Sequence, residues 1–94
     1  MSDTELVKND DDKRYELHLD GERIGSIDWV RDDLVVELLH TEVDSAHGGK
    51  GYAAMLADFA LSDIRDAGLT VRPTCSYVAR HIESNPEYGS IVVE

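Results

Sequence analysis

Three glycines stand within a polar stretch at residues 44–51: Gly48, Gly49 and Gly51. Glycine adopts positive φ angles without strain and lets a ligand approach the backbone closely. If this stretch joins a strand to a helix, its N–H groups can bind an anion such as a diphosphate, with Lys50 as a local cation. The same composition is also typical of a flexible loop, so glycine content alone leaves both interpretations open.

Cys75 and His40 are the second set of residues that could do chemistry. Cys75 precedes a predicted helix, and a helix N-terminus lowers the pKa of a thiol. His40 lies near the end of the most apolar predicted strand, and both side chains are expected to face one crevice outside the strand ends. There the imidazole could take a proton from the thiol or from an incoming amine. The alternatives are a small buried core cysteine and a hydrogen-bonded strand histidine.

The elements that position these residues begin with strands. Residues 15–19 alternate apolar and polar side chains, which is typical of a half-buried strand, and a further strand is expected around Leu6. Asp20-Gly21 predicts a type I′ hairpin turn, which leads into a returning strand at 24–30. The apolar run at 34–39 predicts a central strand, more buried than its neighbours.

The second half of the chain predicts helices. From residue 52 to 67 the apolar residues recur at helical spacing, and Gly68 follows as a helix-ending residue. A short strand at 69–72, a helix at 76–84 and a final extended piece at 91–93 follow. This order predicts an α+β fold: an antiparallel β-meander, then a right-handed β-α-β crossover and a C-terminal helix.

Composition limits the function classes. The chain has 94 residues, with 9 Lys+Arg against 20 Asp+Glu and a net charge of −11, which predicts one domain over 1–94 and disfavours nucleic acid and anionic lipid. The charge fits a solvated surface, attraction of a cationic substrate or a salty cytoplasm. No apolar run approaches the length of a membrane span, so no membrane association is expected. Residues 1–5 show no signal peptide, which predicts a cytoplasmic protein, and no spacing of His, Cys and Asp suggests a metal.

Four segments of the chain, at 40–43, 49–53, 73–78 and 85–88, read HTEV, GKGYA, PTCSYV and NPEY. In this order and at these spacings they resemble the short, minimal members of the GNAT-type N-acetyltransferase superfamily, which lack the early helices. The resemblance covers about residues 15–88. It implies a single minimal GNAT-like domain that takes acetyl-CoA as acetyl donor and transfers acetyl to an amine, directly or through an acetylated Cys75.

The resemblance also implies roles for individual residues. Backbone groups around Val43 would bind the pantetheine arm and polarise the thioester carbonyl. The subfamily is associated with a Cys and a His near the thioester, here Cys75 and His40. Independently of the resemblance, Tyr77 and Tyr88 are weaker candidates to protonate the leaving thiolate, since tyrosine is more often a packing residue. His18 and His81 are expected at solvated surface positions. The N–H groups that would hold the diphosphate belong to Gly49, Lys50, Gly51, Tyr52 and Ala53.

One position departs from the superfamily pattern. Its phosphate loop reads Gln/Arg-x-x-Gly-x-Gly/Ala, which Gly51 and Ala53 match at the last two fixed positions, whereas Gly48 stands at the first. This departure leaves room for a non-catalytic acyl-CoA-binding or protein-interaction domain that keeps the fold. The acceptor remains open among polyamines, amino acids, lysine side chains and N-termini. The chain is expected to be a monomer or a weak homodimer, in which a second copy could complete the acceptor pocket.

Overall fold

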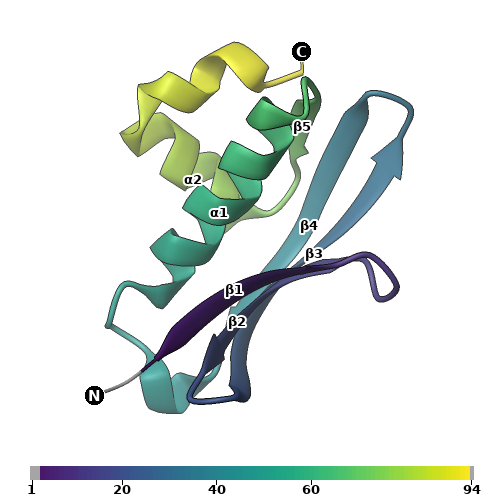
Figure 1. The fold of residues 1–94 in the computed structure, drawn as a ribbon. Helices are drawn as coiled ribbons and strands as arrows, with labels where there is room; N and C mark the ends of the chain where they lie inside the picture. The colour runs from purple at the N-terminus through teal and green to yellow at the C-terminus, as the bar shows by residue number, and fades with distance from the viewer. Residues whose placement is uncertain (1–2, 94) are drawn as a thin grey trace.

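The computed structural model describes residues 3–93 (Figure 1). Five strands form one sheet in the order β1-β2-β3-β4-β5, antiparallel from β1 to β4, with β5 parallel to β4. The strands are β1 (Thr4–Asn9), β2 (Arg14–Leu19), β3 (Glu22–Asp32), β4 (Val35–Val43) and β5 (Thr70–Pro73). The helices are α1 (Tyr52–Asp66) and α2 (Ser76–Ser84), with the 3-10 segments η1 (Ser45–His47) and η2 (Pro86–Ile91). This order confirms the predicted α+β class, with its meander, crossover and C-terminal helix.

The β2–β3 turn has the predicted geometry. Asp20 and Gly21 have φ angles of 51° and 86°, as a type I′ turn requires at both central positions. The residue pair therefore fixes where β2 ends and β3 returns.

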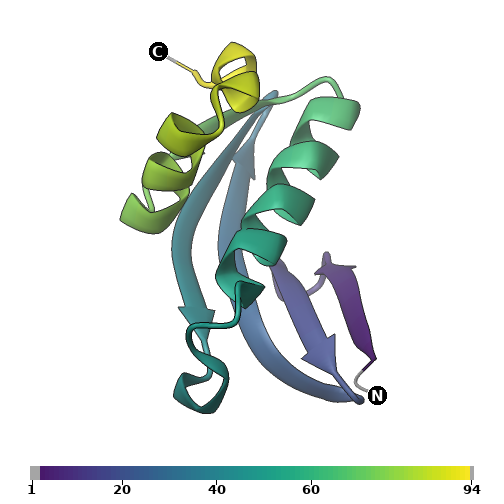
Figure 2. The same cartoon turned by 90° about the vertical axis from the view of Figure 1, so that its left-hand side faces the viewer.

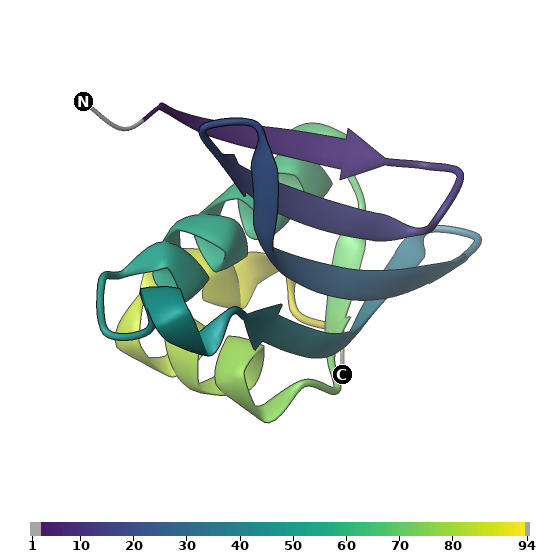
Figure 3. The ribbon, with the colours of Figure 1, turned by 90° about the horizontal axis from the view of Figure 1, so that it is seen from below.

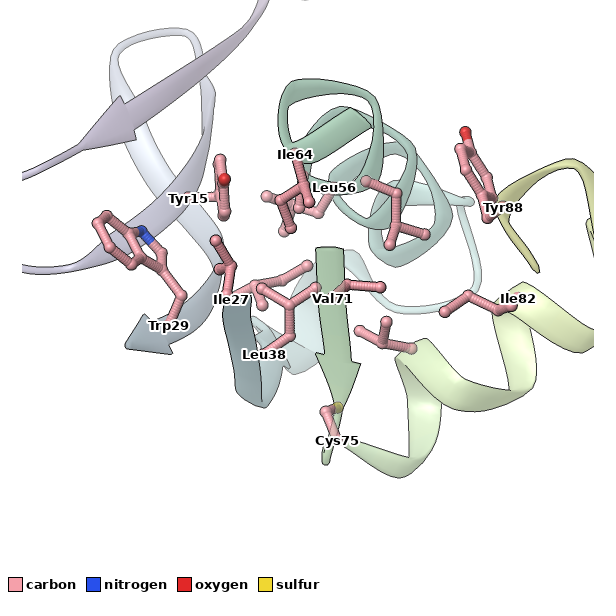
Figure 4. Packing of buried hydrophobic residues seen from close by; sticks show 14 of the residues in the cluster. Tyr15, Ile27, Trp29, Leu38, Leu56, Ile64, Val71, Cys75, Ile82 and Tyr88 are labelled. Atoms are coloured by element: carbon pink, nitrogen blue, oxygen red, sulfur yellow. The ribbon is translucent and has the colours of Figure 1, made fainter. Parts of the chain in front are cut away.

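Helix α1 lies across one face of the sheet, and α2 packs beside it at the β5 end (Figure 2). The apolar residues of both helices and of the covered sheet face share one core (Figure 4). The sheet approaches α1 closely at Gly25, where a Cβ atom would lie 2.9 Å from Leu56 Cδ1. Burial of this core is the main source of stability for so small a chain.

Strand β4 differs from the prediction, because its residues are not buried throughout. Val36 and Leu38 are buried under the helices, whereas Leu39 is 38% exposed and Leu34, in the preceding turn, is 57% exposed. The cause is that α1 covers one face of the sheet, so β4 alternates between a buried and an open face. We call the face turned away from α1 the open face.

The chain end also differs from the prediction of an extended piece at 91–93. Ile91 closes η2, and within the described residues the end of the chain joins the sheet through a single parallel bridge between Val92 and Val71, where the Val93 N–H donates to the Val71 carbonyl at 2.9 Å. The two predicted helices lie where expected, α1 within one residue of its predicted end. No helix within residues 3–93 is long and apolar enough to cross a membrane.

Candidate active site

Strands β4 and β5 part in the middle of β4. Their pairing runs from Val35 with Thr70 to Leu38 with Pro73, and the Cys75 N–H donates to the Leu38 carbonyl at 2.9 Å. Beyond Leu38, β4 continues to Val43 while the other chain turns away into α2. The parting therefore opens the sheet edge next to Cys75, the first residue before α2.

A β-bulge sets which side chains of β4 face this opening. Asp28 of β3 opposes His40 while the next residue, Trp29, opposes Leu38, so Leu39 is an extra residue in β4. An extra residue reverses the alternation that follows it. Thr41 consequently faces the α1 side, and His40 points to the open face.

The expectation that Cys75 and His40 face one crevice is therefore wrong. The His40 side chain is 64% exposed and its Nε2 lies 3.5 Å from a carboxylate oxygen of Glu42, on the open face. Among the described residues, the side chain that hydrogen-bonds to the Cys75 thiol is Thr41, with Sγ and Oγ1 3.2 Å apart. The sequence contains no local sign of the bulge, so Thr41 was missed as a site residue.

The Cys75 thiol occupies a polar position at the start of α2. Burial raises its pKa, but hydrogen bonds to the Thr41 hydroxyl and to the N–H groups of Val78 and Tyr77 outweigh burial. The pKa of Cys75 consequently lies below its ordinary value, in the direction expected for a thiol at a helix N-terminus. Because Cys75 is 9% exposed and belongs to the core cluster, it is both a packing residue and a candidate nucleophile.

The glycine stretch forms the loop between η1 and α1. Gly49 and Gly51 have φ angles of 76° and 80°, in the left-handed region that glycine favours, so the loop requires glycine at both positions. Gly48 instead has an extended backbone, with φ −65° and ψ 153°. Gly51 is the residue before α1, and its carbonyl accepts from the Met55 N–H at 3.1 Å.

A pocket of about 240 Å³ lies against this loop and the start of α1. No side chain caps the first turn of α1 within the described chain, and that turn holds no acidic residue, so its N–H groups remain free to bind an anion. Figure 3 shows the first turn of α2 near the end of β4 and the loop that leads into α1. The pocket is lined by Val43, His47, Gly48, Gly49, Gly51, Tyr52, Ala53, Ala54 and Tyr77.

The pocket brings together most of the residues expected to bind a diphosphate. Gly49, Gly51, Tyr52 and Ala53 line it, whereas the exposed Lys50 does not. Val43, expected at the pantetheine arm, lines the same pocket. None of the described residues lining this pocket carries a carboxylate, although the chain has a net charge of −11. The site therefore fits an anionic group bound by backbone donors.

A larger pocket of about 370 Å³ lies where the start of β3 meets the end of β4. Its lining includes Arg23, Ser26 and the two carboxylates of Glu42 and Asp44. Two carboxylates disfavour an anionic ligand. For the diphosphate we therefore consider the smaller pocket.

A partly buried polar network joins α1, α2 and η2. Asp58 of α1 accepts hydrogen bonds from His81 Nε2 at 2.8 Å and from the Tyr88 hydroxyl at 3.0 Å. The His81 ring also stacks between those of Tyr77 and Tyr88, with centroids 6.2 Å apart in both pairs. The His81 side chain is 11% exposed, so the expectation of a solvated histidine there is wrong. Through the stacking of His81 on Tyr77, the network contacts a residue that lines the pocket.

His18, the other histidine expected at the surface, is also engaged. Its Nε2 lies 2.9 Å from a carboxylate oxygen of Glu16, and its side chain is 25% exposed. Within residues 3–93 no group of three or more His, Cys, Asp and Glu side chains is placed to hold a metal ion.

Comparison with known proteins points to one family. The sequence profile of the family described as GCN5-related N-acetyl-transferase matches residues 14–91. Protein NATD1 of Homo sapiens and of Gallus gallus are each 38% identical over 52 residues, or 55% of this chain. The match covers 46% and 47% of these relatives, so the chain spans about half the length of the curated relatives it matches.

The fold is similar to that of a solved acetyltransferase. The ribosomal-protein-S18-alanine N-acetyltransferase from Escherichia coli superposes with a TM-score of 0.67, over 89% of this chain and 76% of that one. The sequences are 11% identical, so this likeness concerns the fold alone.

Proposed function

Because this chain belongs to the GCN5-related N-acetyltransferase family, a fold and family that support acetyl transfer, we propose that it moves the acetyl group of acetyl-CoA to an amine. The observation that carries this proposal is the carboxylate-free pocket at the open N-terminus of α1. Its lining includes Val43 at the end of β4 and Tyr77 in the first turn of α2, the two segments that diverge beyond Leu38. One site can therefore hold a diphosphate at one end and a thioester near Cys75 at the other.

The diphosphate end is assigned to the loop and the first turn of α1. N–H groups at a helix N-terminus favour an anion through both hydrogen bonds and the helix dipole. The left-handed backbone at Gly49 and Gly51 turns the chain without placing a Cβ atom within reach of the ligand. Such backbone donors bind a diphosphate despite the acidic character of the whole chain.

The thioester end is assigned to β4 beyond Leu38, where backbone groups have no β5 partner. In direct transfer, the free-base amine nitrogen attacks the thioester carbonyl carbon. The C–N bond forms, the C–S bond breaks, the amine nitrogen loses a proton to a base, and the departing sulfur gains one. In relayed transfer, the Cys75 thiolate attacks first, the C–S bond to CoA breaks, and the CoA sulfur takes up the proton that Cys75 had lost. The amine then attacks the Cys75 thioester, the C–N bond forms, the C–S bond to Cys75 breaks, and the proton lost by the amine returns to the Cys75 sulfur.

The acceptor amine is assigned to the open face of the sheet. His40 and Glu42 are exposed there, on the side of β4 opposite to Thr41. Under this proposal His40 is the base for an incoming amine and does not act on Cys75. The neighbouring carboxylate of Glu42 favours binding of the acceptor as a protonated, cationic amine, which then loses its proton before it attacks.

Tyr77 is the better of the two tyrosine candidates for protonating the leaving sulfur. It lines the pocket, and burial together with the Asp58 carboxylate raises its pKa, which keeps the phenol protonated at neutral pH. The Tyr88 hydroxyl already donates to Asp58.

The test is calorimetric titration with acetyl-CoA, followed by measurement of free CoA thiol in the presence of a panel of amines. Binding with amine-dependent thiol release supports the transferase. Binding without release from any amine supports the non-catalytic acyl-CoA-binding domain. Absence of binding at millimolar acetyl-CoA contradicts both.

A further inference from the structure

The pocket beside α1 contains one side chain whose hydrogen bonding is incomplete. Nδ1 of His47 is almost wholly inaccessible to solvent and has no hydrogen-bond partner among the described residues. The imidazole ring lies edge-on to the Tyr52 ring, with centroids 6.2 Å apart, and both residues line the pocket. Buried polar atoms normally have a partner, and leaving this nitrogen without one is unfavourable. Because His47 lines the pocket, a ligand bound there can supply that partner.

The chemistry of the lining indicates what this partner is. Of the described residues that line the pocket, only His47 carries a nitrogen in its side chain; the others are aliphatic residues, glycines and two tyrosines. Rotation of the ring about its Cβ–Cγ bond exchanges Nδ1 with Cδ2, and so turns the nitrogen toward the other side. Since His47 and the first residues of α1 line one pocket, an imidazole N–H turned into that pocket can reach the same ligand as the free N–H groups of α1. All of these donors require an oxygen acceptor, and an oxyanion satisfies them together.

We propose that His47 donates a hydrogen bond to the diphosphate of acetyl-CoA. This inference rests on the proposed function and names a further binding residue for it. Gly48 has no side chain at the position where the superfamily loop carries Gln or Arg, and His47 immediately precedes it at the end of η1. Under this proposal the side chain that donates to the phosphates belongs to residue 47, one position before the Gln or Arg of the superfamily loop. Its effect is specific for ligands that carry a diphosphate.

The experiment compares two ligands by calorimetric titration of the full chain. Acetyl-CoA carries the diphosphate, whereas S-acetylpantetheine has the same thioester and arm without it; weak binding of the latter is measured by competition. His47→Phe keeps a ring against Tyr52 and removes both nitrogens, and His47→Gln keeps an N–H donor. We expect His47→Phe to bind acetyl-CoA roughly tenfold more weakly or worse, as for loss of a hydrogen bond to a charged group. We expect His47→Gln to lose less, and S-acetylpantetheine to bind all three proteins alike.

Two results overturn the inference. Equal affinity of the wild type and His47→Phe for acetyl-CoA shows that the imidazole does not contact the diphosphate. Equal losses with both ligands show that His47 only shapes the pocket. Circular dichroism checks folding, and His47→Ala replaces His47→Phe if the latter does not fold. Failure of the proposed function is distinguishable, since the wild type then binds no acetyl-CoA at all.

Discussion

The Sγ atom of Cys75 lies 3.2 Å from the Oγ1 atom of Thr41, across the point where β4 and β5 part. This contact joins the start of α2 to the face of β4 that is turned toward α1. It gives the thiol a hydrogen-bonding partner that stabilises the thiolate, in addition to the N–H groups of the first turn of α2.

Thr41→Val should therefore raise the pKa of Cys75, because the variant keeps the shape of the side chain and removes the hydroxyl. The thiolate fraction at pH 7 falls, and alkylation by iodoacetamide becomes slower. The measurement is the alkylation rate as a function of pH, read by mass spectrometry. Thr70→Val is the matched control, since its hydroxyl bonds to the Leu34 carbonyl and not to the thiol. An unchanged rate for Thr41→Val would assign the low pKa to the helix N-terminus alone.

His40→Ala separates the two roles that this histidine can have. Because its side chain lies on the open face, the alkylation rate of Cys75 should match that of the wild type. If His40 deprotonates the acceptor amine, acetyl transfer should fall by about a hundredfold, the lower range for loss of a general base. Slower alkylation of Cys75 in this variant would contradict the placement of His40 on the open face. An unchanged rate of acetyl transfer would show that His40 is not the base for the amine.

Gly51→Val should disturb the loop before α1. Its φ of 80° is a left-handed conformation, which costs a β-branched residue roughly 1–2 kcal/mol or more, and the loop must shift to relieve it. We expect weaker acetyl-CoA binding together with a lower free energy of unfolding in urea. Gly48→Ala is the control, because Gly48 is extended and a Cβ there makes only an ordinary 3.5 Å contact with the Ser45 carbonyl. Equal effects of the two changes would mean that φ at Gly51 is not the limiting factor.

How much of the fold and of the candidate site could be predicted from the sequence depends on whether neighbouring residues in the chain determine each feature. The bounds of α2 follow from nearby residues, because Pro73 and Pro86 restrict the chain on either side of Ser76–Ser84. The positive φ angles at Asp20 and Gly21 are likewise encoded by that residue pair. Such features need no knowledge of the rest of the fold.

The orientation of His40 and the burial of His81 were not predictable in this way. The bulge at Leu39 depends on the register between β3 and β4, which the residues of β4 alone do not determine. His81 is largely shielded from solvent because Asp58, 23 residues earlier on another helix, accepts its hydrogen bond, and because the rings of Tyr77 and Tyr88 stack on it. Both corrections concern contacts between distant segments, and these decide which face of an element a side chain occupies.

Gly48→Arg should tighten acetyl-CoA binding about tenfold at low salt. Its extended backbone accepts a side chain without strain, so the new guanidinium can supply the charge-assisted contact that glycine lacks. The gain should shrink as salt rises, because exposed charges are screened. Titrations of both proteins at low and high salt measure it, with Gly48→Gln as an uncharged comparison. No gain at low salt in a folded variant would place the phosphates away from residue 48.

Glu16 should make the stability of the fold depend on acidic pH. It lies on the open face of β2 with its carboxylate 2.9 Å from Arg14 Nε, 2.9 Å from His18 Nε2 and 3.1 Å from Asn9 Nδ2. Burial raises the pKa of this carboxyl, but the hydrogen bonds to His18, Arg14 and Asn9 prevail and lower it to about 2. Since the folded-state pKa lies below that of the unfolded chain, the stabilisation is complete above pH 4.5, the ordinary value, and is lost as the pH falls toward 2.

Glu16→Gln tests this directly, because it keeps the size of the side chain and removes the charge. At pH 7 we expect the free energy of unfolding to fall by about 1–3 kcal/mol, as for a partly buried charge-assisted network. Between pH 4.5 and pH 2 the wild type should lose stability more steeply than the variant, so the two curves converge. Urea denaturation at several pH values, followed by circular dichroism, gives both curves. Glu5→Gln, at an exposed position of β1, is the control and should leave the pH dependence unchanged. Parallel curves for the wild type and Glu16→Gln would show that Glu16 titrates in the folded protein as it does in the unfolded chain.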